Sequence, residues 1–108
     1  MKNVPNGCFE LLIDAIHSYD IDACRRMMEY VKPRSRFAYS AYLCAIKYDF
    51  TTYCMEFVHT VELYKELEDK SCFLDYVCPD DDLYDFLVKH GACHSSEHIL
   101  LGEINSQL

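Results

Sequence analysis

Cysteine and histidine residues gather in the last third of the sequence, where their thiols and imidazoles could bind a metal ion. Such ligands suit Zn²⁺, and paired ligands usually have about two to four residues between them. Here five residues separate Cys72 from Cys78, which is a loose spacing. A small zinc-binding regulator is therefore one hypothesis. The alternative, which we expect, has both cysteines packed in a helix, the histidines exposed, and no metal or cofactor. The candidate ligands are Cys72, Cys78, His90, Cys93, His94 and His98.

The motifs of common enzymes are missing from the sequence. It contains no G-x-S-x-G, no P-loop, no G-x-G-x-x-G and no C-x-x-C. Residues 80–82 with Asp85 resemble a site for a metal or a basic partner, but carboxylates at the start of a helix are already explained by the helix dipole. We therefore expect no catalytic residue and a protein that is not an enzyme.

Length and composition favour one mostly helical domain. The chain has 108 residues, of which 51% are hydrophobic and only three are glycine and three proline. A chain of this size can bury roughly 65% of its unfolded surface. Its composition is unlike that of disordered chains or turn-rich β-sandwiches. We therefore expect an all-α fold with a single domain over residues 1–108.

Charge is unevenly distributed along the chain. The net charge is −8; residues 1–54 carry seven basic and six acidic residues, and residues 55–108 carry three and twelve. An acidic half repels phosphate backbones, so we expect no nucleic-acid partner. The basic residues of the first half are more typical of a solvated surface than of a nucleic-acid or membrane patch. They are Arg25, Arg26, Lys32, Arg34 and Arg36.

The sequence carries no sign of secretion or membrane insertion. Its first eight residues, MKNVPNGC, lack the apolar run of a secretory signal, and no later segment approaches the roughly 18 apolar residues of a membrane span. The cysteine count is seven, which is odd, and three of the cysteines fall in apolar periodic positions. We expect a cytoplasmic protein with reduced thiols and no contact with a membrane.

Two ten-residue segments of the sequence begin and end alike. AIHSYDIDAC, residues 15–24, returns as AIKYDFTTYC, residues 45–54. The same shift, applied to the whole chain, aligns three units in seven apolar or near-apolar columns, although the polar Asp75 falls in one of them. The columns are Ile13/Leu43/Phe73, Ala15/Ala45/Asp75, Ile16/Ile46/Tyr76, Ala23/Tyr53/Leu83, Cys24/Cys54/Tyr84, Met27/Phe57/Leu87 and Met28/Val58/Val88.

Each unit contains two apolar clusters, which predict a helix, a tight turn and a second helix. The units lie near residues 9–32, 39–61 and 69–92, with turns at 19–22, 49–52 and 79–82 whose Asp and Thr side chains can cap the next helix. Residues 95–105 are expected to form a capping helix. The link VELYKELEDK, residues 61–70, is either a helical extension or a long acidic loop.

The units resemble ankyrin repeats. DLYDFLVKHGA, residues 82–92, is similar to the second helix and exit of that repeat, with Gly91 as a left-handed C-cap, and LLIDAI and AYLCAI resemble its opening. The period is 30 rather than about 33, the Thr-Pro-Leu-His entry is missing, and no interhelical turn has glycine. The resemblance implies a short stack of about three helix-turn-helix units.

Degenerate ankyrin units rich in Tyr, Cys, Asp and Lys also resemble those of large DNA viruses, namely the multigene families of African swine fever virus and the ankyrin-like proteins of poxviruses. This resemblance implies a viral factor that binds a host signalling protein and interferes with innate immune signalling. The partner-binding side chains would lie on the exposed side of the first helix of each unit. The predicted contact residues are His17, Ser18, Tyr42, Lys47, Tyr48 and Val77, with Cys78 beside them.

We therefore predict a non-enzymatic protein–protein interaction module. Two alternatives stay open: a self-associating structural subunit that forms a homodimer, and the zinc-binding regulator.

Overall fold

The computed structural model describes residues 7–95, and within this range every regular element is a helix. The expected all-α fold is confirmed. The chain divides after Val61 into two units, each with its own internal packing. The expected single domain over residues 1–108 stays a prediction.

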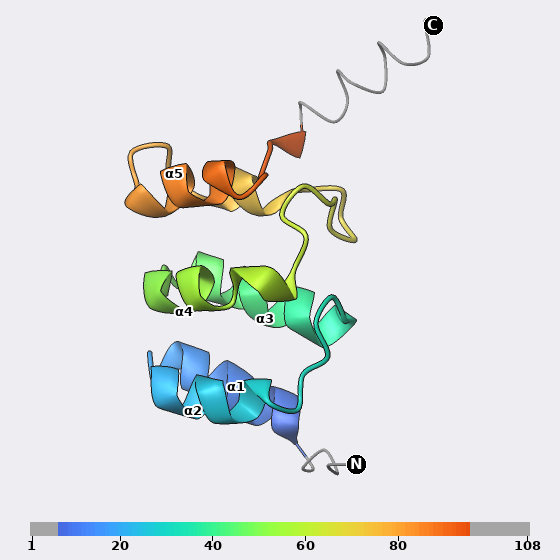
Figure 1. Ribbon diagram of the computed structural model, residues 1–108, viewed down its shortest axis with the longest axis vertical. Coiled ribbons are helices and arrows are strands. Elements are labelled where there is room, and N and C mark those ends of the chain that lie inside the picture. The colour runs from blue at the N-terminus through green and yellow to red at the C-terminus, as the bar shows by residue number, and fades with distance from the viewer. Residues whose placement is uncertain (1–6, 96–108) are drawn as a thin grey trace, which may run out of the picture. The chain divides into compact units, whose positions relative to one another are not determined.

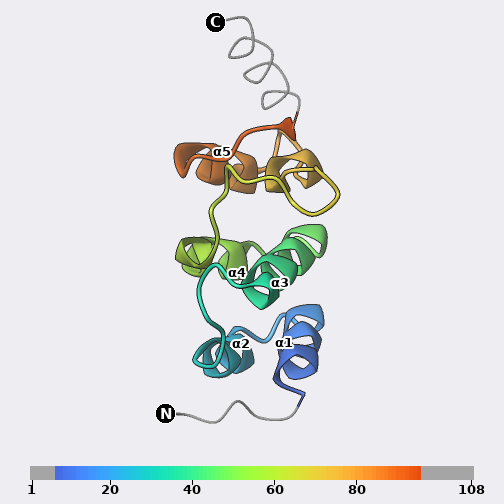
Figure 2. The same ribbon diagram turned by 90° about the vertical axis from the view of Figure 1, so that its right-hand side faces the viewer.

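The first unit is built from two helical hairpins. The helices are α1 (Cys8–His17), α2 (Ile21–Met28), α3 (Arg36–Lys47) and α4 (Thr51–Glu56), followed by the 3₁₀ helix η1 (Val58–Thr60). The α1–α2 hairpin packs on the α3–α4 hairpin (Figure 1). Figure 2 shows α1 and α3 in one column, and α2 and α4 in the other. In this part of the chain the helices thus form two pairs, each joined by a short turn.

Polar side chains fix where two of these helices begin. The Asp20 carboxylate accepts a hydrogen bond from the Ala23 amide at 3.1 Å, and the Ser35 hydroxyl accepts one from the Ala38 amide at 3.3 Å. Each bond satisfies an amide that has no partner inside its helix. Helix α4 differs, because the residue before it is the buried Phe50, which offers no side-chain acceptor.

The turn inside each hairpin repeats in the backbone. Tyr19 and Asp49 occupy the same position in their repeats and have φ angles of 54° and 56°. In both turns the next amide donates to a carbonyl five residues back: Asp20 to Ala15 at 2.9 Å, and Phe50 to Ala45 at 2.8 Å. This bonding is typical of a helix that ends in a left-handed residue.

The core of the first unit lies between the two hairpins. Tyr42 is fully buried, and within the α3–α4 hairpin its hydroxyl donates a hydrogen bond to the Cys54 carbonyl at 2.6 Å. Small residues next to it allow the helices to approach closely. The residues with no exposed surface include Leu12, Ile16, Cys24, Ala38, Ala41, Tyr42, Ala45, Tyr53 and Cys54.

A loop opens the second unit. Residues 62–71 form turns rather than a helix, held by bonds such as that from the Lys70 amide to the Leu67 carbonyl at 2.9 Å. Of the two expectations for VELYKELEDK, the loop is correct and the helical extension is wrong. The loop leads to the 3₁₀ helix η2 (Phe73–Tyr76), which packs against α5 (Asp82–Lys89).

The third repeat departs from the first two, because a four-residue 3₁₀ helix replaces the expected first α-helix. Pro79 explains the difference. It takes the place that Tyr19 and Asp49 have in the earlier turns, where φ is positive, and proline holds φ at about −65°. Proline also disfavours a helical conformation at the residue before it. The first helix of this repeat therefore ends early, and Val77 is extended, with φ −112° and ψ 134°.

The exit of the third repeat follows the prediction. Gly91 has φ 98°, and the Ala92 amide donates to the Leu87 carbonyl at 3.0 Å, so Gly91 is the left-handed C-cap of α5. The start of α5 is capped by Asp81, whose carboxylate accepts from the Leu83 amide at 3.1 Å. The expected capping helix over 95–105 falls, except for Ser95, outside the described residues.

Candidate binding surface

Four of the six predicted contact residues come together at one end of the first unit. His17 and Ser18 lie at the end of α1, Lys47 and Tyr48 at the end of α3, and all four are exposed. The rings of His17 and Tyr48 pack with their centroids 4.4 Å apart. The structure thus places side chains from the two hairpins on one surface.

Tyr19 belongs to the same surface, although sequence reasoning assigned it only to a turn. Its hydroxyl donates a hydrogen bond to the main-chain oxygen of Tyr48 at 2.5 Å. Its ring packs edge-on against that of Phe50, with the centroids 5.2 Å apart. We call His17, Tyr19 and Tyr48 the aromatic patch. In the sequence, the one indication that Tyr19 belongs to this surface is its position directly after Ser18, a predicted contact residue.

The two tyrosines of the aromatic patch are exposed and yet held in place. Tyr19 is 53% exposed and Tyr48 is 45% exposed. Ring packing fixes both side chains, so a partner would order few rotamers on binding them. Tyrosine is also enriched among the residues that contribute most to protein interfaces, because one ring offers both apolar area and a polar tip.

The other two predicted contact residues are buried, so the prediction was wrong for them. Tyr42 has no exposed surface, because it continues the buried stripe of α3 that includes Ala38, Ala41 and Ala45. Val77 is 9% exposed. The early end of η2 removes Val77 from the exposed helical position that His17 and Lys47 occupy. Cys78, its neighbour, is exposed in the second unit.

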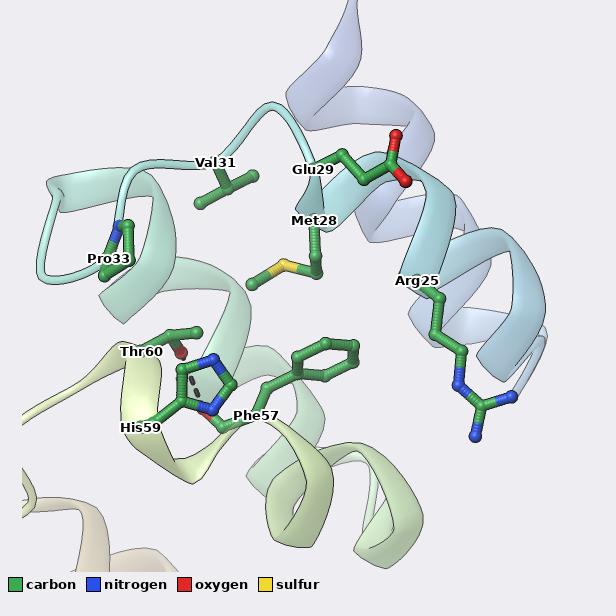
Figure 3. A pocket seen from close by; sticks show the side chains of 8 residues that line it. All are labelled: Arg25, Met28, Glu29, Val31, Pro33, Phe57, His59 and Thr60. Atoms are coloured by element: carbon green, nitrogen blue, oxygen red, sulfur yellow. Dashed lines mark hydrogen bonds between the residues drawn. The ribbon is translucent and has the colours of Figure 1, made fainter.

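A second feature of the first unit is a hollow of about 250 Å³ beside the end of α2 (Figure 3). Met28, Val31 and Phe57 give it an apolar floor, and the picture shows the Met28 side chain and the Phe57 ring directed toward each other. Sequence reasoning missed this hollow, which depends on how the segment after α2 meets η1. The lining residues are Arg25, Met28, Glu29, Val31, Pro33, Phe57, His59 and Thr60.

Arg25 at the edge of the hollow is held by carboxylates. Its Nε and Nη2 atoms donate to Glu56 at 2.8 and 2.6 Å, and its Nη1 donates to Asp22 at 3.0 Å. The hydrogen bond from Arg25 lowers the pKa of the Glu56 carboxyl. This pairing joins α2 to α4 and neutralises the charge of Arg25.

The five candidate zinc ligands within residues 7–95 are not gathered around one point. In the range 7–95 no three His, Cys, Asp or Glu side chains lie close enough to hold a metal ion together. Cys72 is buried, Cys78 is exposed, and His98 lies outside the described residues.

His94 instead belongs to a polar network. Its Nδ1 lies 3.1 Å from the Asp75 carboxylate and its Nε2 lies 2.8 Å from the Tyr84 hydroxyl. Burial opposes the charge of Asp75, but hydrogen bonds from the Cys72 amide, Ser95 and His94 outweigh it and lower the pKa of Asp75 to about 2.

The buried thiols are poor nucleophiles. Burial raises the pKa of Cys24 to about 11, and it also raises the pKa values of Cys8 and Cys44. The thiolate is the reactive form of cysteine, and a higher pKa leaves less of it at neutral pH. These three cysteines therefore act in the structure as small apolar side chains.

Comparisons with known proteins add no relative. A scan against protein-family models, a search of curated proteins and a search of solved structures found no match. Among the described residues, no helix has both the length and the apolar character needed to cross a membrane.

Proposed function

We propose that this chain is a non-enzymatic protein-binding module that contacts its partner through the aromatic patch, with Ser18 and Lys47 beside it. The proposal rests on one contact between the two hairpins. The His17 ring, at the end of α1, packs against the Tyr48 ring, at the end of α3, with the ring centroids 4.4 Å apart. This packing, with the Tyr19 hydrogen bond, fixes two half-exposed tyrosines.

A purely solvated surface accounts less well for these residues. Exposed tyrosines that stand alone are common on proteins and need no explanation. Here Tyr19 and Tyr48 share a surface with the His17 imidazole and the Lys47 amine. Ring packing already orders both tyrosine side chains. Such an arrangement suits recognition, because the entropy of ordering the side chains is lost on folding rather than on binding.

The resemblance of the repeats to ankyrin-like proteins of large DNA viruses suggests the nature of the partner. On that basis, the chain acts in the host cytosol as a viral factor, and its partner is a host protein of innate immune signalling. The resemblance rests on the repeated apolar columns and on the exit at Gly91.

The experiment is quantitative capture of proteins from mammalian cytosolic lysate, with mass spectrometry as the readout. Native chain is compared with a Lys47→Glu/Tyr48→Ala variant, whose exposed positions leave the core intact. Tyr64→Ala is the matched control, because Tyr64 is 54% exposed but lies in the second unit. We expect one host protein to be enriched by the native chain and the control and lost with the double variant.

Equal capture by all three proteins would contradict the assignment of the surface. Light scattering over a dilution series then tests the homodimer, since a stable dimer whose mass falls only in the double variant would place self-association at this surface.

A further inference from the structure

The hollow (Figure 3) adjoins the C-terminal end of α2, at Met28, and therefore lies away from the aromatic patch. The patch adjoins the turn before Ile21, whereas the hollow adjoins Met28 and the segment that follows. We propose that this hollow is a second docking site, which takes one apolar side chain carried on an acidic segment of a partner protein.

The walls of the hollow are fixed before any partner arrives. The Arg34 amide donates to the Thr60 carbonyl at 2.7 Å, which ties the segment after α2 to η1. The Thr60 hydroxyl donates to the Phe57 carbonyl at 2.6 Å, the bond drawn in Figure 3. The Tyr53 hydroxyl lies 3.4 Å from the sulfur of Met28. A site formed in advance binds with a smaller entropic cost.

Size and lining favour a single anchoring side chain. The volume of about 250 Å³ is below the roughly 300–1,000 Å³ of pockets that enclose whole small molecules. The floor is apolar, but Val31 and Phe57 are each only 8% exposed, so a ligand would meet just the small outer surfaces of these two side chains. A depression of this size admits one apolar side chain, and the side chains that anchor protein interfaces fill pockets of this kind.

The segment that contributes Val31 and Pro33 to the hollow is basic, which favours an acidic segment as the partner. Residues 30–37, YVKPRSRF, carry Lys32, Arg34 and Arg36 and no carboxylate, and their Val31 and Pro33 line the hollow. Glu29 is the carboxylate among the lining residues, and Figure 3 shows its side chain turned away from Phe57. Positive charge beside an apolar floor attracts carboxylates that flank an apolar anchor.

A second copy of this chain is a less suitable occupant. Each whole copy carries a net charge of −8, so two copies repel one another, whereas a short acidic segment at the hollow meets mainly residues 1–61, whose seven basic and seven acidic residues balance. The basic segment of residues 30–37, which the sequence indicated only as a solvated surface, thus has a specific role in this proposal.

The test follows the methyl groups of methionine by NMR in the full chain. The probe is a short blocked peptide with one leucine between glutamates. We expect the Met28 methyl signal to shift on titration, while that of Met55, an exposed residue of α4, stays in place. Two matched peptides separate the contributions: serine replaces the leucine in one, and glutamines replace the glutamates in the other. Both should bind more weakly.

A protein variant tests the charge without altering the floor. Lys32→Gln/Arg34→Asn removes two positive charges, and asparagine tolerates the φ of 63° that Arg34 adopts. It should weaken binding of the glutamate peptide by about three- to tenfold and reduce its salt dependence. Lys89→Gln, an exposed position at the end of α5 in the second unit, should bind the peptide like the native chain.

Three results would overturn the proposal: no shift of Met28 at millimolar peptide, equal binding of the serine peptide, or equal binding of the glutamine peptide. A Met28 shift on dilution of the protein alone, with a mass that halves in light scattering, would assign the hollow to a second copy and would also overturn it.

Discussion

The hydroxyl of Tyr19 donates a hydrogen bond to the main-chain oxygen of Tyr48, at 2.5 Å, and so joins the turns of two neighbouring hairpins. Each tyrosine belongs to a different repeat, yet they contribute to one exposed surface. The stacking of the hairpins therefore does two things: it buries the apolar columns, and it assembles a patch that neither hairpin has alone.

Tyr19→Phe isolates the contribution of this hydrogen bond. The ring can still pack against Phe50, so we expect the free energy of unfolding to fall by only about 0.5 to 1 kcal/mol. Urea denaturation provides the measurement. Tyr64→Phe is the control, since Tyr64 is as exposed as Tyr19, and it should leave the stability within about 0.5 kcal/mol of native. Equal losses in the two variants would show that the Tyr19 bond contributes nothing.

Asp49 allows a direct test of the left-handed turn. At φ 56° an L residue is strained and glycine is not. Asp49→Gly should therefore be more stable than Asp49→Ala, by about 1 kcal/mol, although alanine usually exceeds glycine in helices. Both variants lose the aspartate side chain, so their difference in urea denaturation reports the backbone alone. The reverse order would exclude a left-handed residue at this position.

The buried tyrosines predict a loss of stability in alkali. Burial raises the pKa values of Tyr42 and Tyr53 far above the value of about 10 that they have in the unfolded chain. The folded protein keeps protons that the unfolded chain releases. Stability should thus be complete below about pH 10 and fall as the pH rises above it.

Tyr42→Phe tests the alkaline prediction. At neutral pH it should lower the free energy of unfolding by about 1 to 3 kcal/mol, because the Cys54 carbonyl loses a buried donor. Above pH 10 its stability should fall less steeply than that of the native chain. Parallel curves for the two proteins would mean that Tyr42 ionises freely in the folded state.

The lowered pKa of Asp75 predicts a loss of stability in acid. Its pKa is lowered to about 2, so its contribution to stability is present above about pH 4, the value of an unfolded aspartate, and is lost as the pH falls toward 2. Asp75→Asn should be less stable than the native chain at neutral pH and equally stable near pH 2. Carboxyl NMR gives the midpoint directly, and a value near 4 for Asp75 would contradict the hydrogen-bond network.

The repeat pattern predicted α1 to α4 because the buried columns recur with similar side chains, as in Ala15 and Ala45 or Cys24 and Cys54. It did not reveal one further column. Leu12, Tyr42 and Cys72 occupy the same position in the three repeats, and none has exposed surface. Their side chains differ so much in size and polarity that comparison of residue types does not align them, and Tyr42 was assigned to the surface as a result.

The third repeat differs from the first two in its first helix, for two reasons. One of them, Pro79, is visible in the sequence. Pro79 cannot adopt the positive φ of the earlier turns. Asp75, which breaks an apolar column, bonds the Cys72 amide at the start of η2 and meets His94. The contact with His94 joins two residues far apart in the sequence, so no helical period predicts it. The aromatic patch and the hollow likewise depend on side-chain packing between segments distant in sequence.

The most direct test of the aromatic patch is site-specific photocrosslinking. A benzophenone amino acid replaces Tyr48 in one protein and Tyr64 in the other, and each is irradiated in mammalian cytosolic lysate. We predict a crosslinked host protein from position 48, absent from position 64 and lost on competition with excess unlabelled native chain. Identical crosslinks from both positions, or none that native chain displaces from position 48, would contradict binding at this surface.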